Sequence, residues 1–185
     1  MIAHFKVSRP LAKFAVLLAA LATLSLISAE VASANFGAPA NPCKQFKKNS
    51  KAWKECMGQV KPDDTSRADE QFTKGYWLAK TGDYTQALEV LKALPNQNDA
   101  GVLTMIGYAT RHLGRVDEAL GYYGKALALN ANLTNTRQYL GEAYLQKNDV
   151  AKAKFELAEI GRICGSTACE DYRALDKAIA VHEKS

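Results

Sequence analysis

The sequence contains little histidine and lacks the short motifs of common catalytic sites. Only three histidines occur in 185 residues, and the two outside the N-terminal segment, His112 and His182, have no zinc-ligand spacing with the cysteines. A Gly-rich phosphate loop, a Gly-x-Ser-x-Gly motif and a Cys-x-x-Cys motif are all missing. The sequence therefore predicts a protein that is not an enzyme and that uses no metal and no cofactor.

A strong net charge is also missing from most of the chain. Residues 35–185 carry 21 basic and 18 acidic side chains, which is a poor electrostatic footprint for nucleic acid. The positive charge that remains is concentrated in five lysines within eleven residues: Lys44, Lys47, Lys48, Lys51 and Lys54. This segment is predicted either to contact an anionic membrane or cell-wall surface, or simply to keep a short module solvated.

Long apolar runs are confined to the N-terminus. Basic residues precede an uncharged run over 14–29, and the small residues Ala32, Ser33 and Ala34 follow it. This order is typical of a secretory signal peptide, so we expect residues 1–34 to be removed near Ala34. An uncleaved membrane anchor is the alternative, although the run is short for a span of about 20 apolar residues. The expected location is periplasmic or secreted.

The sequence has four cysteines, and export would place them where disulfides form. Four cysteines allow three connectivities, and proximity favours pairing Cys43 with Cys56 and Cys164 with Cys169. The first pair requires a chain reversal between its members, because thirteen residues of straight helix would separate them by roughly 20 Å. Structural disulfides are favoured over a redox site, because neither pair has thioredoxin-like spacing.

Proline is scarce beyond Pro62, and a repeating helical pattern begins there. Three Gly/Ala pairs are spaced twelve residues apart, and the second and third start 34 residues from one another: Gly75 and Ala87, Gly107 and Ala119, Gly141 and Ala153. Such a period indicates stacked helix-turn-helix units. Gly82, Gly114 and Asn148 occupy matching places between the helices, where a left-handed C-terminal cap is expected. The small pairs predict a close crossing of the two helices in each unit.

These positions carry a family resemblance over residues 66–162. Leu103, Gly107, Tyr108, Ala119 and Tyr123 resemble the signature of the tetratricopeptide repeat, as do Leu140, Gly141, Tyr144 and Ala153. The first unit departs from the pattern, with Lys74 before its Gly and Leu94 at a usually small place. The segment from Ile163 to Glu170 is similar to the C-terminal ending of small exported proteobacterial proteins with this repeat. The implied fold is all-α, a short solenoid of about three helix-turn-helix repeats with a C-terminal capping helix.

The resemblance implies a concave groove lined by the first helix of each unit. Matching this chain to the family's groove positions gives Phe72, Tyr76, Lys80, Thr104, Tyr108, Arg111, His112, Asn135, Gln138 and Glu142. Tyrosine and arginine are frequent in binding hot spots, so a peptide with apolar and acidic groups would suit such a surface. The alternative is that these residues only form a solvated helix face.

Together these features predict four segments: a signal peptide over 1–34, a linker and Cys-closed basic arm over 35–65, repeats over 66–162, and a Cys-stapled capping helix over 163–185. The expected function is a non-enzymatic scaffold or adaptor of the bacterial cell envelope. Its groove would bind a segment of another exported or envelope protein. The alternative is an envelope-surface binder that uses the basic arm on anionic polymer or lipid headgroups. The sequence leaves the partner and the oligomeric state open.

Overall fold

The computed structural model describes residues 41, 43–48, 50–59 and 66–185. The predicted signal peptide therefore lies outside the described residues, as do residues 35–40, 42, 49 and 60–65 of the predicted linker and basic arm. In the part described, eight helices and no strands are found: α1 (Lys51–Gln59), α2 (Ser66–Thr81), α3 (Tyr84–Lys92), α4 (Ala100–His112), α5 (Val116–Leu129), α6 (Thr134–Gln146), α7 (Val150–Cys164) and α8 (Glu170–His182). The predicted all-α class is confirmed.

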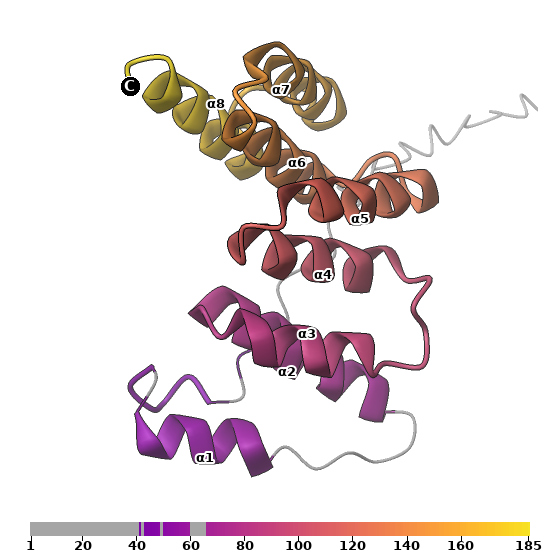
Figure 1. The fold of residues 1–185 in the computed structure, drawn as a ribbon, viewed down its shortest axis with the longest axis vertical. Coiled ribbons are helices and arrows are strands. Elements are labelled where there is room, and N and C mark those ends of the chain that lie inside the picture. The colour runs from indigo at the N-terminus through magenta and orange to yellow at the C-terminus, as the bar shows by residue number, and fades with distance from the viewer. Residues whose placement is uncertain (1–40, 42, 49, 60–65) are drawn as a thin grey trace, which may run out of the picture. The chain divides into compact units, whose positions relative to one another are not determined.

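The helices pack as successive hairpins. α2 packs on α3, α4 on α5 and α6 on α7, while α3 contacts α4 and α5 contacts α6, so the hairpins stack in chain order (Figure 1). The first two hairpins turn at Gly82 (φ +99°) and Gly114 (φ +82°), and the third turns at Asn148 (φ +58°). Only glycine and asparagine adopt this left-handed region readily, so the predicted caps are confirmed.

The small residues of the repeat make room for side chains rather than for bare backbone. A Cβ added to Gly107 would lie 2.7 Å from the ring of Tyr123 on α5, and one added to Gly75 would lie 2.6 Å from the Leu91 side chain on α3. Ala87, Ala119 and Ala153 are fully buried on the second helices. The repeat therefore pairs a glycine with one large side chain from its partner helix.

The third unit departs from this rule. Its glycine, Gly141, faces Leu175 of α8, whose side chain would lie 2.5 Å from an added Cβ. α8 packs against both α6 and α7, and Thr134 on α6 donates a 2.7 Å hydrogen bond to Asp171 on α8 (Figure 1). The C-terminal helix thus covers α6 as the next repeat would, which is the predicted capping role.

Both expected disulfides are present. Cys43 bonds to Cys56, with their α-carbons 6.0 Å apart, and Cys164 bonds to Cys169 across the turn between α7 and α8, with α-carbons 6.4 Å apart. The first bond ties the loop before α1 to that helix. Trp53 on α1 is 2 % exposed and belongs to the same buried cluster as Leu78 and Leu91, so the predicted arm includes a packed helix.

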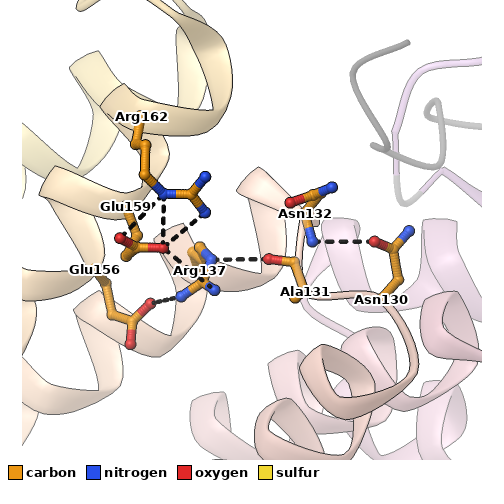
Figure 2. Close-up of polar contacts among 7 residues, drawn as sticks. All are labelled: Asn130, Ala131, Asn132, Arg137, Glu156, Glu159 and Arg162. Carbon is orange, nitrogen blue, oxygen red and sulfur yellow. Dashed lines mark hydrogen bonds and ion pairs between the residues drawn. The ribbon is translucent and has the colours of Figure 1, made fainter. Parts of the chain in front are cut away.

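A largely buried ion pair joins α6 to α7 (Figure 2). Arg137 Nη1 lies 2.7 Å from Glu156 Oε2, and both side chains are nearly inaccessible to water, at 12 % and 7 % exposed. Arg137 Nε donates a 3.1 Å hydrogen bond to the carbonyl of Ala131, in the loop before α6. Glu159 lies 3.8 Å from Arg137 and is also paired with the exposed Arg162. The Arg137 side chain therefore connects three segments of the third unit.

Candidate functional site

Side chains from three first helices meet in one aromatic cluster. Lys80 on α2 donates a 3.2 Å hydrogen bond from Nζ to the hydroxyl of Tyr139 on α6. The same Nζ lies 4.8 Å from the ring centroid of Tyr108 on α4, within cation–π range. The rings of Tyr108 and Tyr139 contact each other edge to face, with centroids 4.8 Å apart. One lysine thus bridges tyrosines of the second and third units.

His112, at the end of α4, extends this cluster towards α3. Its ring stacks on Tyr84 with centroids 4.7 Å apart and an interplanar angle of 9°, and it also contacts Tyr108 at 4.4 Å. Although part of its surface is exposed to solvent, desolvation in this cluster and the positive charges of Arg111 and Lys80 lower the pKa of His112 to about 4. The imidazole is therefore neutral near pH 7 and acts as an aromatic ring. We call Lys80, Tyr84, Tyr108, His112 and Tyr139 the tyrosine cluster.

We expect His112 to titrate near pH 4 and to make the protein acid-sensitive. Because its folded pKa lies below the ordinary value of 6.5, the folded state binds fewer protons than the unfolded chain between those values. Stability from this residue is complete above about pH 6.5 and is lost as the pH falls towards 4. An NMR titration of the ring protons gives the pKa, and His112→Phe should reduce the pH dependence of unfolding in this window. Titration at an ordinary pH would contradict the described packing.

An ion pair lies next to the tyrosine cluster. Arg111 on α4 is 5 % exposed, and its Nη2 lies 2.6 Å from Glu142 Oε2 on α6. Gln138, one turn earlier on α6, donates a 2.9 Å hydrogen bond to the other oxygen of Glu142. Burial is the main cause that raises the pKa of Tyr139 to about 12, and the carboxylates of Asp171 and Glu142 add to it. The tyrosine hydroxyls therefore remain protonated hydrogen-bonding groups at neutral pH.

An open cavity of about 630 Å³ adjoins this ion pair. Arg111 and Glu142 form one side of it, and residues from the end of α6 and from α8 form the rest. Its surface is mostly apolar, through Leu145, Ala174, Ala178 and Val181, and Lys177 adds a positive charge. Val181 is 62 % exposed, although it is a large aliphatic residue on the last helix. The cavity is large enough for side chains of a bound peptide.

The ten predicted groove residues fall into separate groups. Six are connected to one another through the tyrosine cluster and the ion pair: Lys80, Tyr108, Arg111, His112, Gln138 and Glu142. Asn135, at the start of α6, accepts a hydrogen bond from the backbone N–H of Thr136. Phe72 lines a smaller cavity of about 290 Å³ with Leu94, Pro95 and Val102.

Two predicted groove residues lie in the interior instead. Thr104 is fully buried, and its hydroxyl is 2.7 Å from that of Thr136, one repeat further along the chain. Tyr76 is 8 % exposed and packs against Phe72 and Trp77. Both residues therefore serve packing between helices in this structure, because a ligand cannot reach a side chain that neighbouring helices cover.

Sequence reasoning missed Tyr139 and the cavity residues of α8. Tyr139 lies one helical turn from both Asn135 and Glu142, so the spacing could have placed it on the same helix face as these predicted groove residues. No sequence pattern indicated the α8 residues, because a capping helix is expected to contact α6 and α7 and not to form an open binding surface. Within the described ranges, no three His, Cys, Asp or Glu side chains are grouped so that they could hold a metal ion. None of the described helices is long and apolar enough to cross a membrane.

Comparison with known proteins identifies the fold. No protein-family model matches the chain, and no curated protein matches it in sequence. Two structures of the type III secretion translocator chaperone SycD from Yersinia enterocolitica are similar, each with a TM-score of 0.55, at 16 % and 15 % identity, covering 66 % of this chain and 92 % of SycD.

PcrH, solved in complex with the chaperone-binding region of PopB, is also similar, with a TM-score of 0.54 and 18 % identity over 66 % of this chain and 99 % of PcrH. At such identities the likeness carries no information on the ligand. It does show that the described helices have the tetratricopeptide-like helical-repeat fold of these chaperones.

Proposed function

We propose that this protein is a non-enzymatic binding protein that holds a segment of another exported protein on the surface formed by α4, α6 and α8. The observation that carries the proposal is the 630 Å³ cavity, which lies beside the Arg111–Glu142 pair and has a mainly apolar lining. A surface of this kind suits a segment with aliphatic and acidic side chains, because the lining is mostly apolar and Lys177 adds a positive charge to it.

The comparisons support a binding role by analogy of fold. PcrH was solved with a segment of PopB, and SycD is a chaperone, so at least one protein of this architecture has been captured with a bound segment. Analogy of fold is an associational argument, and the ligand has to follow from the site itself. The two disulfides are consistent with an oxidising compartment, which agrees with the proposed envelope or extracellular location.

Photo-crosslinking from two matched positions tests the proposal. A photoreactive residue in place of Val181 lies at the cavity, and one in place of Phe155 on α7 is equally exposed, at 62 %, but away from it. Irradiated in intact cells of the source organism, the Val181 variant should form a product with one defined protein that the Phe155 variant does not form. Identical products from the two positions would contradict the proposal.

A second pair of variants tests whether the cavity itself is used. Ala178→Phe, added to the Val181 probe, places a ring in the cavity and should remove the crosslink, whereas Ala180→Phe places the same ring on an exposed position of α8 outside it. With the purified partner, Ala178→Phe should weaken binding by about tenfold or more, as expected for a blocked hot spot. Equal binding by both variants would exclude the cavity as the site.

A further inference from the structure

The positive charge of the described chain is concentrated at one end. Residues 43–57 contain five lysines and one acidic residue, Glu55, which gives this segment a net charge of +4. The residues that follow, 58–185, carry 16 basic and 17 acidic side chains. Within residues 43–185 the basic excess therefore lies in residues 43–57, the Cys-closed part of the predicted 35–65 segment, which we call the basic arm from here on.

The basic arm is folded, and all five lysines lie inside its disulfide loop. The loop turns through hydrogen bonds from Phe46 N to the carbonyl of Cys43 and from Ser50 N to that of Lys47. The Ser50 hydroxyl then accepts a hydrogen bond from Trp53 N and caps α1. The Cys43–Cys56 bond closes this unit, so its lysines are held close together without depending on the repeats for their spacing.

One side of the basic arm faces the protein and the other faces solvent. Cys43, Trp53 and Met57 are buried in the cluster that includes Leu78 of α2. In contrast, all five lysines are exposed, and so is Phe46, at 37 %, within the same loop. The exposed surface of the basic arm therefore combines clustered positive charge with one partly exposed aromatic ring.

We propose that the basic arm docks on the headgroups of an anionic lipid bilayer, with Phe46 entering the interface and the lysines contacting the lipid charge. Clustered lysines bind anionic leaflets because each contributes Coulomb attraction within about one Debye length of the surface. Aromatic and aliphatic side chains add affinity by burying their apolar area at the headgroup boundary. A soluble anionic polymer would engage the lysines but would offer Phe46 no apolar layer. This docking is independent of the proposed peptide site.

Vesicle sedimentation tests the proposal with the purified chain lacking residues 1–34 and with its disulfides intact. The protein should bind phosphatidylcholine vesicles that contain phosphatidylglycerol, should not bind phosphatidylcholine alone, and should dissociate at high salt. Lys47→Gln with Lys48→Gln should weaken binding about 25-fold, at about fivefold for each lysine. Lys125→Gln with Lys184→Gln removes the same charge elsewhere and should leave binding nearly unchanged.

The Phe46→Ser variant distinguishes binding to a lipid bilayer from binding to an anionic polymer. It should weaken binding to the anionic vesicles severalfold while leaving any binding to dextran sulfate unchanged. The proposal is overturned if both lysine pairs act equally, if the protein binds neutral vesicles as well, or if Phe46→Ser has no effect on vesicle binding. Circular dichroism and mass measurement of the disulfides confirm that each variant is folded.

Discussion

Gly107→Leu should lower the free energy of unfolding by about 3 kcal/mol or more, the upper end of what overpacked cores show. A Cβ at this position would lie 2.7 and 2.9 Å from two ring atoms of Tyr123, and Tyr123 is fully buried between α4 and α5. Because the ring is buried and Tyr122 Cβ also lies 3.2 Å from the added Cβ, we expect α4 and α5 to separate to admit the new side chain. Denaturant unfolding, with the midpoint and slope fitted together, measures the loss.

Gly124→Leu is the matched control on the partner helix. Gly124 lies in α5, is exposed, and has no atom within 4 Å of an added Cβ. The same substitution there should stabilise the protein by about 0.8 kcal/mol, because leucine favours a helix more than glycine does. Similar losses at both positions would mean that the cost comes from helix propensity or solubility, and the assigned contact with Tyr123 would be wrong.

The local features of the fold could be predicted from the sequence because they depend on single residues. A left-handed cap requires a residue that tolerates positive φ, so Gly82, Gly114 and Asn148 identified the turns, and Gly165 at the end of α7 adopts φ +65° for the same reason. The two disulfides followed from proximity along the chain. In each case the determining residues are close in sequence, at most thirteen residues apart.

Non-local packing accounts for what the sequence did not show. Gly75 and Gly107 face side chains of the second helix of their own unit, yet Gly141 faces Leu175 of α8, because a helix outside the repeats packs against α6. Thr104 similarly occupies a groove position of the family. In the structure its hydroxyl lies in the interior and forms a hydrogen bond with the hydroxyl of Thr136, 32 residues away. The cavity beside α8 depends on the same docking, so no pattern within one repeat could have predicted it.

Arg137→Leu should cost about 3–5 kcal/mol of stability, because it leaves Glu156 buried without its cation. Burial already raises the pKa of Glu156 above its ordinary 4.5, against the lowering effect of Arg137, and without the arginine the pKa should rise further. A carboxyl with a raised folded pKa binds its proton more readily in the folded state. At pH values above 4.5, the stability of Arg137→Leu should therefore increase as the pH falls and decrease as the pH rises.

Two further variants distinguish the buried charge from the loss of packing. Arg162→Leu removes the exposed partner of Glu159 in the same network and should change stability little, because water screens that pair (Figure 2). Arg137→Leu combined with Glu156→Leu removes both charges and should recover most of the loss, since a buried ion pair is often no more stabilising than apolar residues of similar size. If the double variant were as unstable as Arg137→Leu alone, the hydrogen bond to the Ala131 carbonyl, and not the charge on Glu156, would account for the role of Arg137 in joining α6 to α7.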